Sequence, residues 1–72
     1  MDGAEDDGGR RARFESVAAL VVEPVRRFLA RRTDPDTADD VLADTLLVVW
    51  RRLDDVPEGD QALPWTLSLI HI

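Results

Sequence analysis

The sequence contains no cysteine, and its only histidine is His71. Without Cys there can be no disulfide framework, and a single His cannot assemble a Cys/His zinc site. The longest uninterrupted apolar run, residues 17–22, is far shorter than the about 20 residues that span a bilayer. The acidic first residues also lack the basic region of a signal peptide. We therefore predict a cytoplasmic protein that does not enter a membrane.

Aromatic residues are also few, and the chain is short. It has 72 residues, of which 6% are aromatic and 33% are charged. A chain of this size buries only about 60% of the surface that its unfolded form exposes, which leaves little room for a deep catalytic cleft. We predict a single small helical unit without enzymatic activity.

Negative charge prevails, and it is unevenly distributed. The net charge is -6, and residues 34–72 carry nine acids against two Arg, whereas residues 1–33 carry six acids against seven Arg. An acidic surface repels phosphate, so the second half is poorly suited to binding a nucleic-acid backbone. It favours a basic protein partner.

The first half of the chain predicts a tail and one long helix. Residues 1–11 combine three Gly and four acids with almost no apolar side chains, so we expect a disordered acidic tail. Apolar residues then recur at three- and four-residue steps, which predicts a helix over about 12–32. Pro24 lies inside this helix and should cause a kink or a short break. The stripe comprises Phe14, Val17, Ala18, Val21, Val25, Phe28 and Leu29.

The second half predicts a tight turn and a second helix. Asp34 can cap a helix and Pro35 suits its first position, so we expect a helical hairpin with a second helix over about 35–55. One side of that helix carries an apolar stripe, and residues 46–50 spread further apolar surface beyond it. Pro57 and Gly59 mark a loop, after which residues 61–65 look like the approach to a third helix. The predicted fold class is all-α: a helical hairpin plus the start of a third helix.

Chemistry could reside in the acidic segment formed by residues 39–44. Asp40 and Asp44 share a helix face, where like charges cost a few tenths of a kcal/mol. A preference of acids for a helix N-terminus accounts for Asp36, Asp39 and Asp40, but not for Asp44, which lies beyond the first two turns. No nucleophile or base accompanies these carboxylates, and one helix face cannot surround a metal ion. We predict no catalytic residues, no metal site and no cofactor.

The last six residues have a different character. Residues 67–72 match what CTG TCT CTT ATA CAC ATC encodes, which resembles the transposon-end adapter of sequencing libraries. We predict that they are translated adapter, although a natural apolar helix start is the alternative. If the adapter origin holds, the biological reading frame is truncated near Thr66.

Residues 38–54 run Ala-Asp-Asp-Val-Leu-Ala-Asp-Thr-Leu-Leu-Val-Val-Trp-Arg-Arg-Leu-Asp. This segment resembles, in register, the pattern A-E-D-L-V-Q-E-T-F-L-R-A-W-R-x-L-D of region 2.2 in the extracytoplasmic-function (ECF) sigma factors of bacterial RNA polymerase. Residues 14–32 are similar to region 2.1, and residues 63–65 resemble the start of the following helix. The resemblance covers about residues 14–66 and implies a partial region 2 helical bundle over residues 12–66.

The sequence departs from the family in two ways. Ala18 and Val22 replace usual Tyr residues, Ala43 replaces a common Gln, and Leu46 and Val56 replace frequent Phe residues. The promoter-reading helix and the region 4 helix-turn-helix domain are missing. By this resemblance the chain is an N-terminal fragment and not a complete sigma factor.

The resemblance also implies partners and site residues. The second helix would dock on the clamp helices of the largest subunit of core RNA polymerase, where Asp40 and Asp44 would meet Arg side chains. The full-length protein would recognise and melt the minus-ten promoter DNA and could bind an anti-sigma factor. Trp65 could face that DNA, but a core role is the stronger expectation. The polymerase-binding candidates are Asp39, Asp40, Ala43, Asp44, Leu47 and Trp50.

A second interpretation belongs to another class of protein. The chain could be a small acidic helical hairpin that self-associates through residues 46–50 and has no part in transcription. A symmetric dimer would bring Asp40 and Asp44 of two copies into repulsion, whereas a basic clamp would not. These two carboxylates therefore separate the alternatives.

Overall fold

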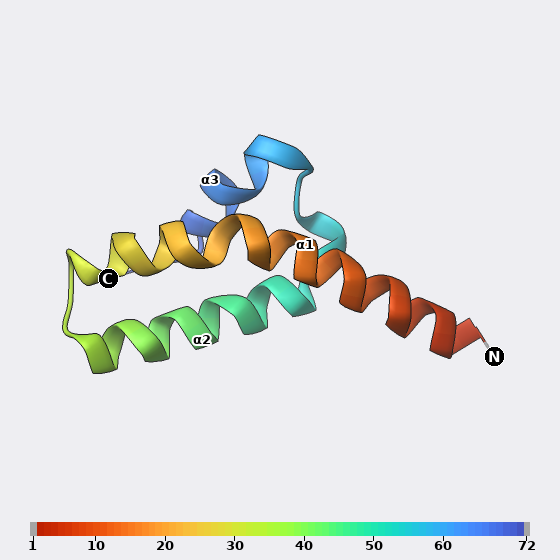
Figure 1. The fold of residues 1–72 in the computed structure, drawn as a ribbon, viewed down its shortest axis with the longest axis horizontal. Coiled ribbons are helices and arrows are strands. Elements are labelled where there is room, and N and C mark those ends of the chain that lie inside the picture. The colour runs from red at the N-terminus through yellow and green to blue at the C-terminus, as the bar shows by residue number, and fades with distance from the viewer. Residues whose placement is uncertain (1, 72) are drawn as a thin grey trace.

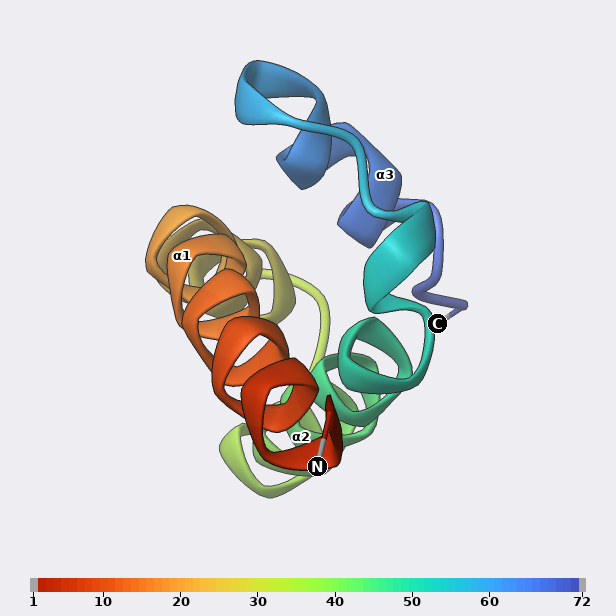
Figure 2. The ribbon, with the colours of Figure 1, turned by 90° about the vertical axis from the view of Figure 1, so that its right-hand side faces the viewer.

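The computed structural model describes the backbone of residues 2–71 and the side chains of residues 8–71, and no strand occurs there. Figure 1 shows α1 and α2 as an antiparallel hairpin, and Figure 2 shows α3 completing a three-sided arrangement with them. The predicted all-α fold, a hairpin followed by a third helix, is confirmed. The elements in chain order are α1 (Asp2–Ala30), α2 (Pro35–Arg51), the 3-10 turns η1 (Leu53–Asp55) and η2 (Gly59–Gln61), and α3 (Ala62–Leu67).

The turn between α1 and α2 forms as predicted. Asp34 is the N-cap of α2, and its Oδ2 accepts a hydrogen bond of 3.1 Å from the backbone N–H of Thr37. Pro35 occupies the first helical turn, where its missing N–H costs nothing. The bond from the Thr37 N–H favours the ionised carboxylate and lowers the pKa of Asp34 below its ordinary value. The turn between the two helices is therefore only four residues long, residues 31–34, and α2 runs antiparallel to α1.

The second helix is shorter than predicted. It ends at Arg51, and residues 53–55 form the 3-10 turn η1 in place of a last α-helical turn. The backbone N–H of Arg52 donates to the Val48 carbonyl at 2.9 Å, and the chain then bends away. Gly59 enters η2 with a φ of 60°, a left-handed conformation that glycine adopts without steric cost. These two turns bring α3 back onto the hairpin.

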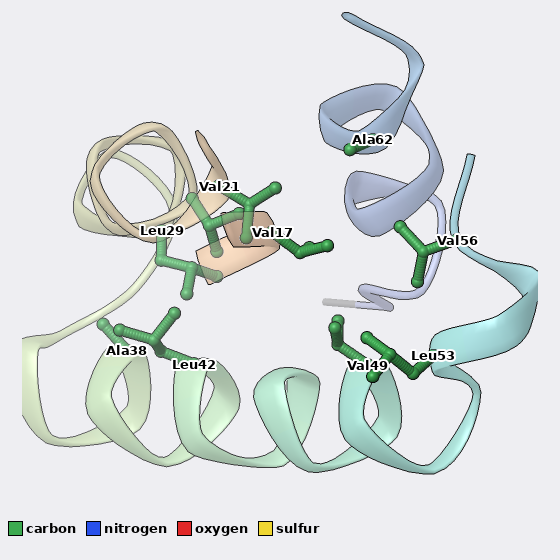
Figure 3. Packing of buried hydrophobic residues seen from close by; sticks show 10 residues of the cluster. Val17, Val21, Leu29, Ala38, Leu42, Val49, Leu53, Val56 and Ala62 are labelled. Carbon is green, nitrogen blue, oxygen red and sulfur yellow. The ribbon is translucent and has the colours of Figure 1, made fainter. Parts of the chain in front are cut away.

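A continuous apolar core joins α1, α2, η1 and α3 (Figure 3). The predicted stripe of α1 supplies four fully buried side chains, and the predicted stripe of α2 faces them. The loop and α3 close the remaining side. Burial of this surface is the main stabilising contribution to the fold. The core consists of Val17, Val21, Val25, Leu29, Ala38, Leu42, Val49, Leu53, Val56 and Ala62.

The first helix begins earlier than predicted. The sequence analysis expected a disordered tail over residues 1–11, whereas α1 is helical from Asp2; Met1 lies outside the described residues. Arg10 donates from Nη2 to the Trp50 carbonyl at 2.6 Å, and Arg13 donates from Nη2 to the Val56 carbonyl at 2.7 Å. These bonds hold α1 against the rest of the chain before its apolar stripe begins, so tertiary contacts order the end of the predicted tail at Arg10.

Pro24 does not break α1. The helix is continuous from Asp2 to Ala30 with Pro24 inside it. Val21 and Val25 are both fully buried on the two sides of the proline. Packing against the rest of the core thus keeps α1 continuous, and the predicted short break does not occur.

The C-terminal residues pack on the hairpin. Leu67 ends α3, and Leu69 and Ile70 lie partly buried against the core. The Leu69 and Ile70 N–H groups donate to the Thr66 and Leu67 carbonyls at 3.0 and 3.1 Å. Apolar side chains cover an apolar surface whatever their origin, so the adapter origin of residues 67–72 stays a prediction; Ile72 lies outside the described residues.

Candidate interaction surface on the second helix

The two sides of α2 have different surroundings. Leu42, Thr45 and Val49 are buried against the rest of the chain. All six residues that the sequence assigned to partner binding are exposed: Asp39, Asp40, Ala43, Asp44, Leu47 and Trp50. None of them belongs to the core. The helical period therefore separates a packing face from a surface that is free to contact another molecule.

Three of these residues form one strip along the outside of α2. Asp40, Asp44 and Leu47 follow one another at steps of four and three residues, and Ala43 lies beside them. Leu47 leaves 47% of its surface exposed. Among the side chains of residues 8–71, neither Asp40 nor Asp44 forms an ion pair. We call Asp40, Ala43, Asp44 and Leu47 the acidic strip; it offers two uncompensated carboxylates beside an apolar side chain.

Asp39 lies at the edge of α2 that faces α1. Its Oδ1 is 3.9 Å from Nη1 of Arg26, and Nε of Arg26 is 3.5 Å from Oε2 of Glu23. All three side chains are largely exposed, so this network contributes little to stability. It does, however, give Asp39 a cation within the chain, which sets Asp39 apart from the acidic strip.

Trp50 is shared between α2 and α1. Its ring meets Phe14 edge to face with centroids 5.5 Å apart, and the guanidinium of Arg10 lies 5.0 Å from the ring centroid. The residue still leaves 37% of its surface exposed. Nη1 of Arg10 also lies 3.7 Å from Oδ1 of Asp54. Trp50 thus continues the exposed apolar surface of α2, while Phe14 and Arg10 of α1 contact its ring.

Trp65 lies on α3, where it is half-buried against the core. The guanidinium of Arg52 lies 5.3 Å from the centroid of its ring. Next to it, Thr66 is completely buried, and its hydroxyl donates to the Ala62 carbonyl at 2.8 Å. Trp65 thus packs against the core of this chain, and its contact with DNA stays a prediction.

A basic groove, which the sequence did not predict, lies between α1 and α3. It has a volume of about 370 Å³ and is lined by Arg27, Arg31 and Arg32 together with Pro24, Phe28, Leu63 and Leu67. The guanidinium of Arg32 stacks on Phe28 at 4.1 Å from the ring centroid. The sequence signal was present, because Arg27 and Arg31 are four residues apart and share a helix face. What it could not predict was that α3 would form the opposite wall.

A smaller groove of about 250 Å³ lies between α2 and the C-terminal residues. Val41, Thr45 and Val48 line it on α2, opposite Leu69 and Ile70. Asp44 and His71 also border this groove. Its apolar walls come mainly from two segments of the same chain, so the segment after α3 covers part of the spare apolar surface predicted for α2.

Within the described residues, no group of three or more His, Asp or Glu side chains is arranged to hold a metal ion. No helix in this part of the chain combines the length and hydropathy that a membrane crossing requires. The surfaces described above are therefore the features from which a function can be argued.

Comparisons of the chain with protein-family models, with curated proteins and with solved structures give no match.

Proposed function

We propose that this chain is part of region 2 of an ECF sigma factor and that the acidic strip docks on the clamp helices of bacterial core RNA polymerase. The resemblance of residues 14–66 to that family motivates the proposal. One observation carries it: the carboxylates of Asp40 and Asp44 are exposed and lack an ion pair among residues 8–71, on a helix whose other side is packed.

The chemistry of the strip suits a basic helical partner. Arg side chains of the clamp pair with carboxylates through charge-assisted, bidentate hydrogen bonds, which are stronger than bonds between neutral groups. Such pairs orient and accelerate the encounter, and the exposed surface of Leu47 and Trp50 adds apolar area to the contact. Asp39 plays a lesser part because Arg26 already lies beside it.

The proposed partner also implies where the protein acts and what it does there. A protein that works on core polymerase acts in the bacterial cytoplasm, as a binding subunit without catalysis of its own. The complete protein recognises and melts the minus-ten promoter element and is open to control by an anti-sigma factor. In this chain, Trp65 supports the region 2 core that presents these surfaces.

Exposure of Leu47 and Trp50 also favours a second candidate, an acidic hairpin module that binds other proteins and has no part in transcription. The two candidates differ in the need for a basic partner. Only the sigma-factor proposal requires that the carboxylates of Asp40 and Asp44 govern binding to core polymerase.

Substitution of Asp44 tests the proposal directly. Asp44→Arg replaces an attractive pair with a repulsive one, so we expect the affinity for purified core polymerase to fall by roughly 2 kcal/mol or more, about 30-fold. Fluorescence anisotropy of the labelled chain at fixed salt measures this. The matched control is Asp60→Arg, because Asp60 is exposed in η2 and, within the described residues, forms no ion pair. Asp55 is less suitable, since Arg52 lies 3.3 Å from its Oδ2.

The control is expected to change binding little. Equal losses for the two variants would reduce the effect to net charge. Unchanged binding of Asp44→Arg, or no binding of the original chain to core polymerase, would remove the clamp assignment. Circular dichroism of each variant verifies that the helix content is retained.

A further inference from the structure

The chain presents two surfaces whose charges are opposite. One is the basic groove between α1 and α3; the other is the acidic strip on the outside of α2. Each surface combines charged groups with apolar side chains. Because the groove is built from α1 and α3 and the strip lies on α2, one copy of the chain can offer both surfaces at once.

The arginines of the groove lack acidic partners in a chain that is rich in acids. The sequence has 15 Asp and Glu against nine Arg. Four of the arginines, at positions 10, 13, 26 and 52, lie within 4.0 Å of a carboxylate. Within the described residues, Arg27, Arg31 and Arg32 form no such pair, and all three line the groove. Their charge is therefore available to an anionic ligand.

The spacing of the charged groups on the two surfaces agrees. Arg27 lies in the last turn of α1 and Arg31 follows four residues later, in the turn just after the helix ends at Ala30; Asp40 and Asp44 lie four residues apart on α2. The carboxylate pair spans one helical turn of about 5.4 Å, and the two arginines have the same separation along the chain. Helices that pack side by side place such rows opposite one another. Two carboxylates can then meet two guanidinium groups in a single register.

Each surface also presents apolar side chains that can pack against those of the other surface. Pro24, Phe28, Leu63 and Leu67 line the groove beneath its arginines. Leu47 lies one turn beyond Asp44 and exposes about half of its surface. Helix α2 can therefore place an apolar side chain over the apolar lining while its carboxylates contact the arginines. A single-stranded nucleic acid fits less well, since the face of Phe28 is already covered by Arg32 and the net charge of -6 repels a polyanion.

We propose that the basic groove binds the acidic strip of a second copy of this chain, in a head-to-tail arrangement. Such an interface joins two different surfaces and avoids the opposition of like carboxylates that a symmetric dimer through α2 would create. Because each copy keeps one unused groove or strip, association continues beyond the dimer unless the ends close into a ring. This self-association stands independently of the proposed function, but it covers the strip assigned to the polymerase clamp.

Sedimentation velocity of the purified chain over a range of concentrations tests the proposal. The original chain is expected to show a sedimentation coefficient that rises with concentration. Arg31→Glu and Asp44→Arg each place like charges at the interface, and each is expected to weaken association about tenfold or more. The controls Arg11→Glu and Asp60→Arg make the same changes of net charge at exposed positions outside both surfaces and are expected to shift it less than about twofold.

Mixing the two interface variants gives the decisive measurement. The Arg31→Glu chain retains the acidic strip, and the Asp44→Arg chain retains the basic groove, so an equimolar mixture is expected to associate more strongly than either variant alone. A monomer at every concentration, a mixture that fails to associate, or equal effects of the controls would overturn the proposal. Arg31→Glu is also expected to leave binding to core polymerase unchanged, which separates this test from that of the clamp assignment.

Discussion

The inner face of α2 packs against the rest of the chain, whereas the outer face is exposed. On the inner face, Leu42 and Val49 are buried in the core that α1 and α3 share. On the outer face, Asp40, Asp44 and Leu47 are exposed, and the carboxylates have no ion pair among the described residues. One helix thus contributes stability with one side and remains available for binding with the other.

The difference shows how a short chain can signal an interaction surface. An amphipathic helix that only packs in a hairpin needs one apolar stripe and a polar remainder. Helix α2 has more apolar surface than that, and the excess at Leu47 and Trp50 lies next to uncompensated acids. Exposed apolar area is costly to leave in water, and the neighbouring carboxylates gain a cation only from another molecule, which is the character of a surface that binds a basic partner.

Substitution of a buried residue on the inner face of α2 should destabilise the fold most. Val49 is completely buried, so Val49→Asp places an unpaired carboxylate in the core, and we expect a loss of roughly 3 kcal/mol or more in the free energy of unfolding. For a chain of this size, such a loss removes most or all of the fold. Thermal unfolding followed by circular dichroism measures the effect.

The matched change on the outer face is Leu47→Asp. Because Leu47 is exposed, we expect a change within about 0.5 kcal/mol in stability together with weaker partner binding. Comparable destabilisation by both substitutions would mean that the two faces of α2 are not distinct.

The contact between Arg10 and Trp50, which lies between the two faces of α2, can be tested by substitution of Arg10. This side chain hydrogen-bonds the Trp50 carbonyl and lies over the Trp50 ring. Arg10→Gln removes the charge-assisted bond and the stacking, so we expect a loss of about 1 kcal/mol in stability. Trp50 fluorescence should also become easier to quench with iodide. Arg11→Gln is the control, since Arg11 is exposed and contacts neither Trp50 nor Phe14 among the interactions described above.

The smallest effect is expected at Asp34, the N-cap residue in the turn that precedes α2. The lowered pKa of Asp34 means that its carboxylate stabilises the folded state above its ordinary value of 3.8, and this contribution is lost as the pH falls through the lowered folded value. Asp34→Ala should therefore lower Tm by a few degrees near neutral pH. The difference in Tm from the original chain should shrink as the pH falls below about 4. A difference that stays constant down to the acid limit would contradict the capping role of the carboxylate.

Local features predicted much of this structure. The four-residue spacing of Val17, Val21 and Val25 predicted the buried side of α1, and Asp34 with Pro35 predicted the turn. The exposure of the acidic strip followed from the same periodicity, because residues opposite a buried stripe face outward. Both rely on interactions within a few residues, which the sequence displays directly.

Contacts between distant residues could not be predicted in this way. Arg10 and Trp50 are 40 positions apart, and Arg13 and Val56 are 43 apart. Their meeting depends on the register of α1 against α2, which nothing near either residue encodes. The contacts of Arg10, two residues before the predicted start of the first helix, could therefore not be predicted from the sequence around it.

Periodicity and capping are short-range effects, so the helical class, the place of the hairpin turn, the buried stripes and the outward orientation of Asp40, Asp44 and Leu47 can be predicted from the sequence. The coverage of Trp50 and the position of Arg27, Arg31 and Arg32 in one groove with α3 depend on the tertiary structure. These features require segments far apart in the chain to meet. Their positions follow from the packing of the whole core, in which each contact depends on the placement of every helix.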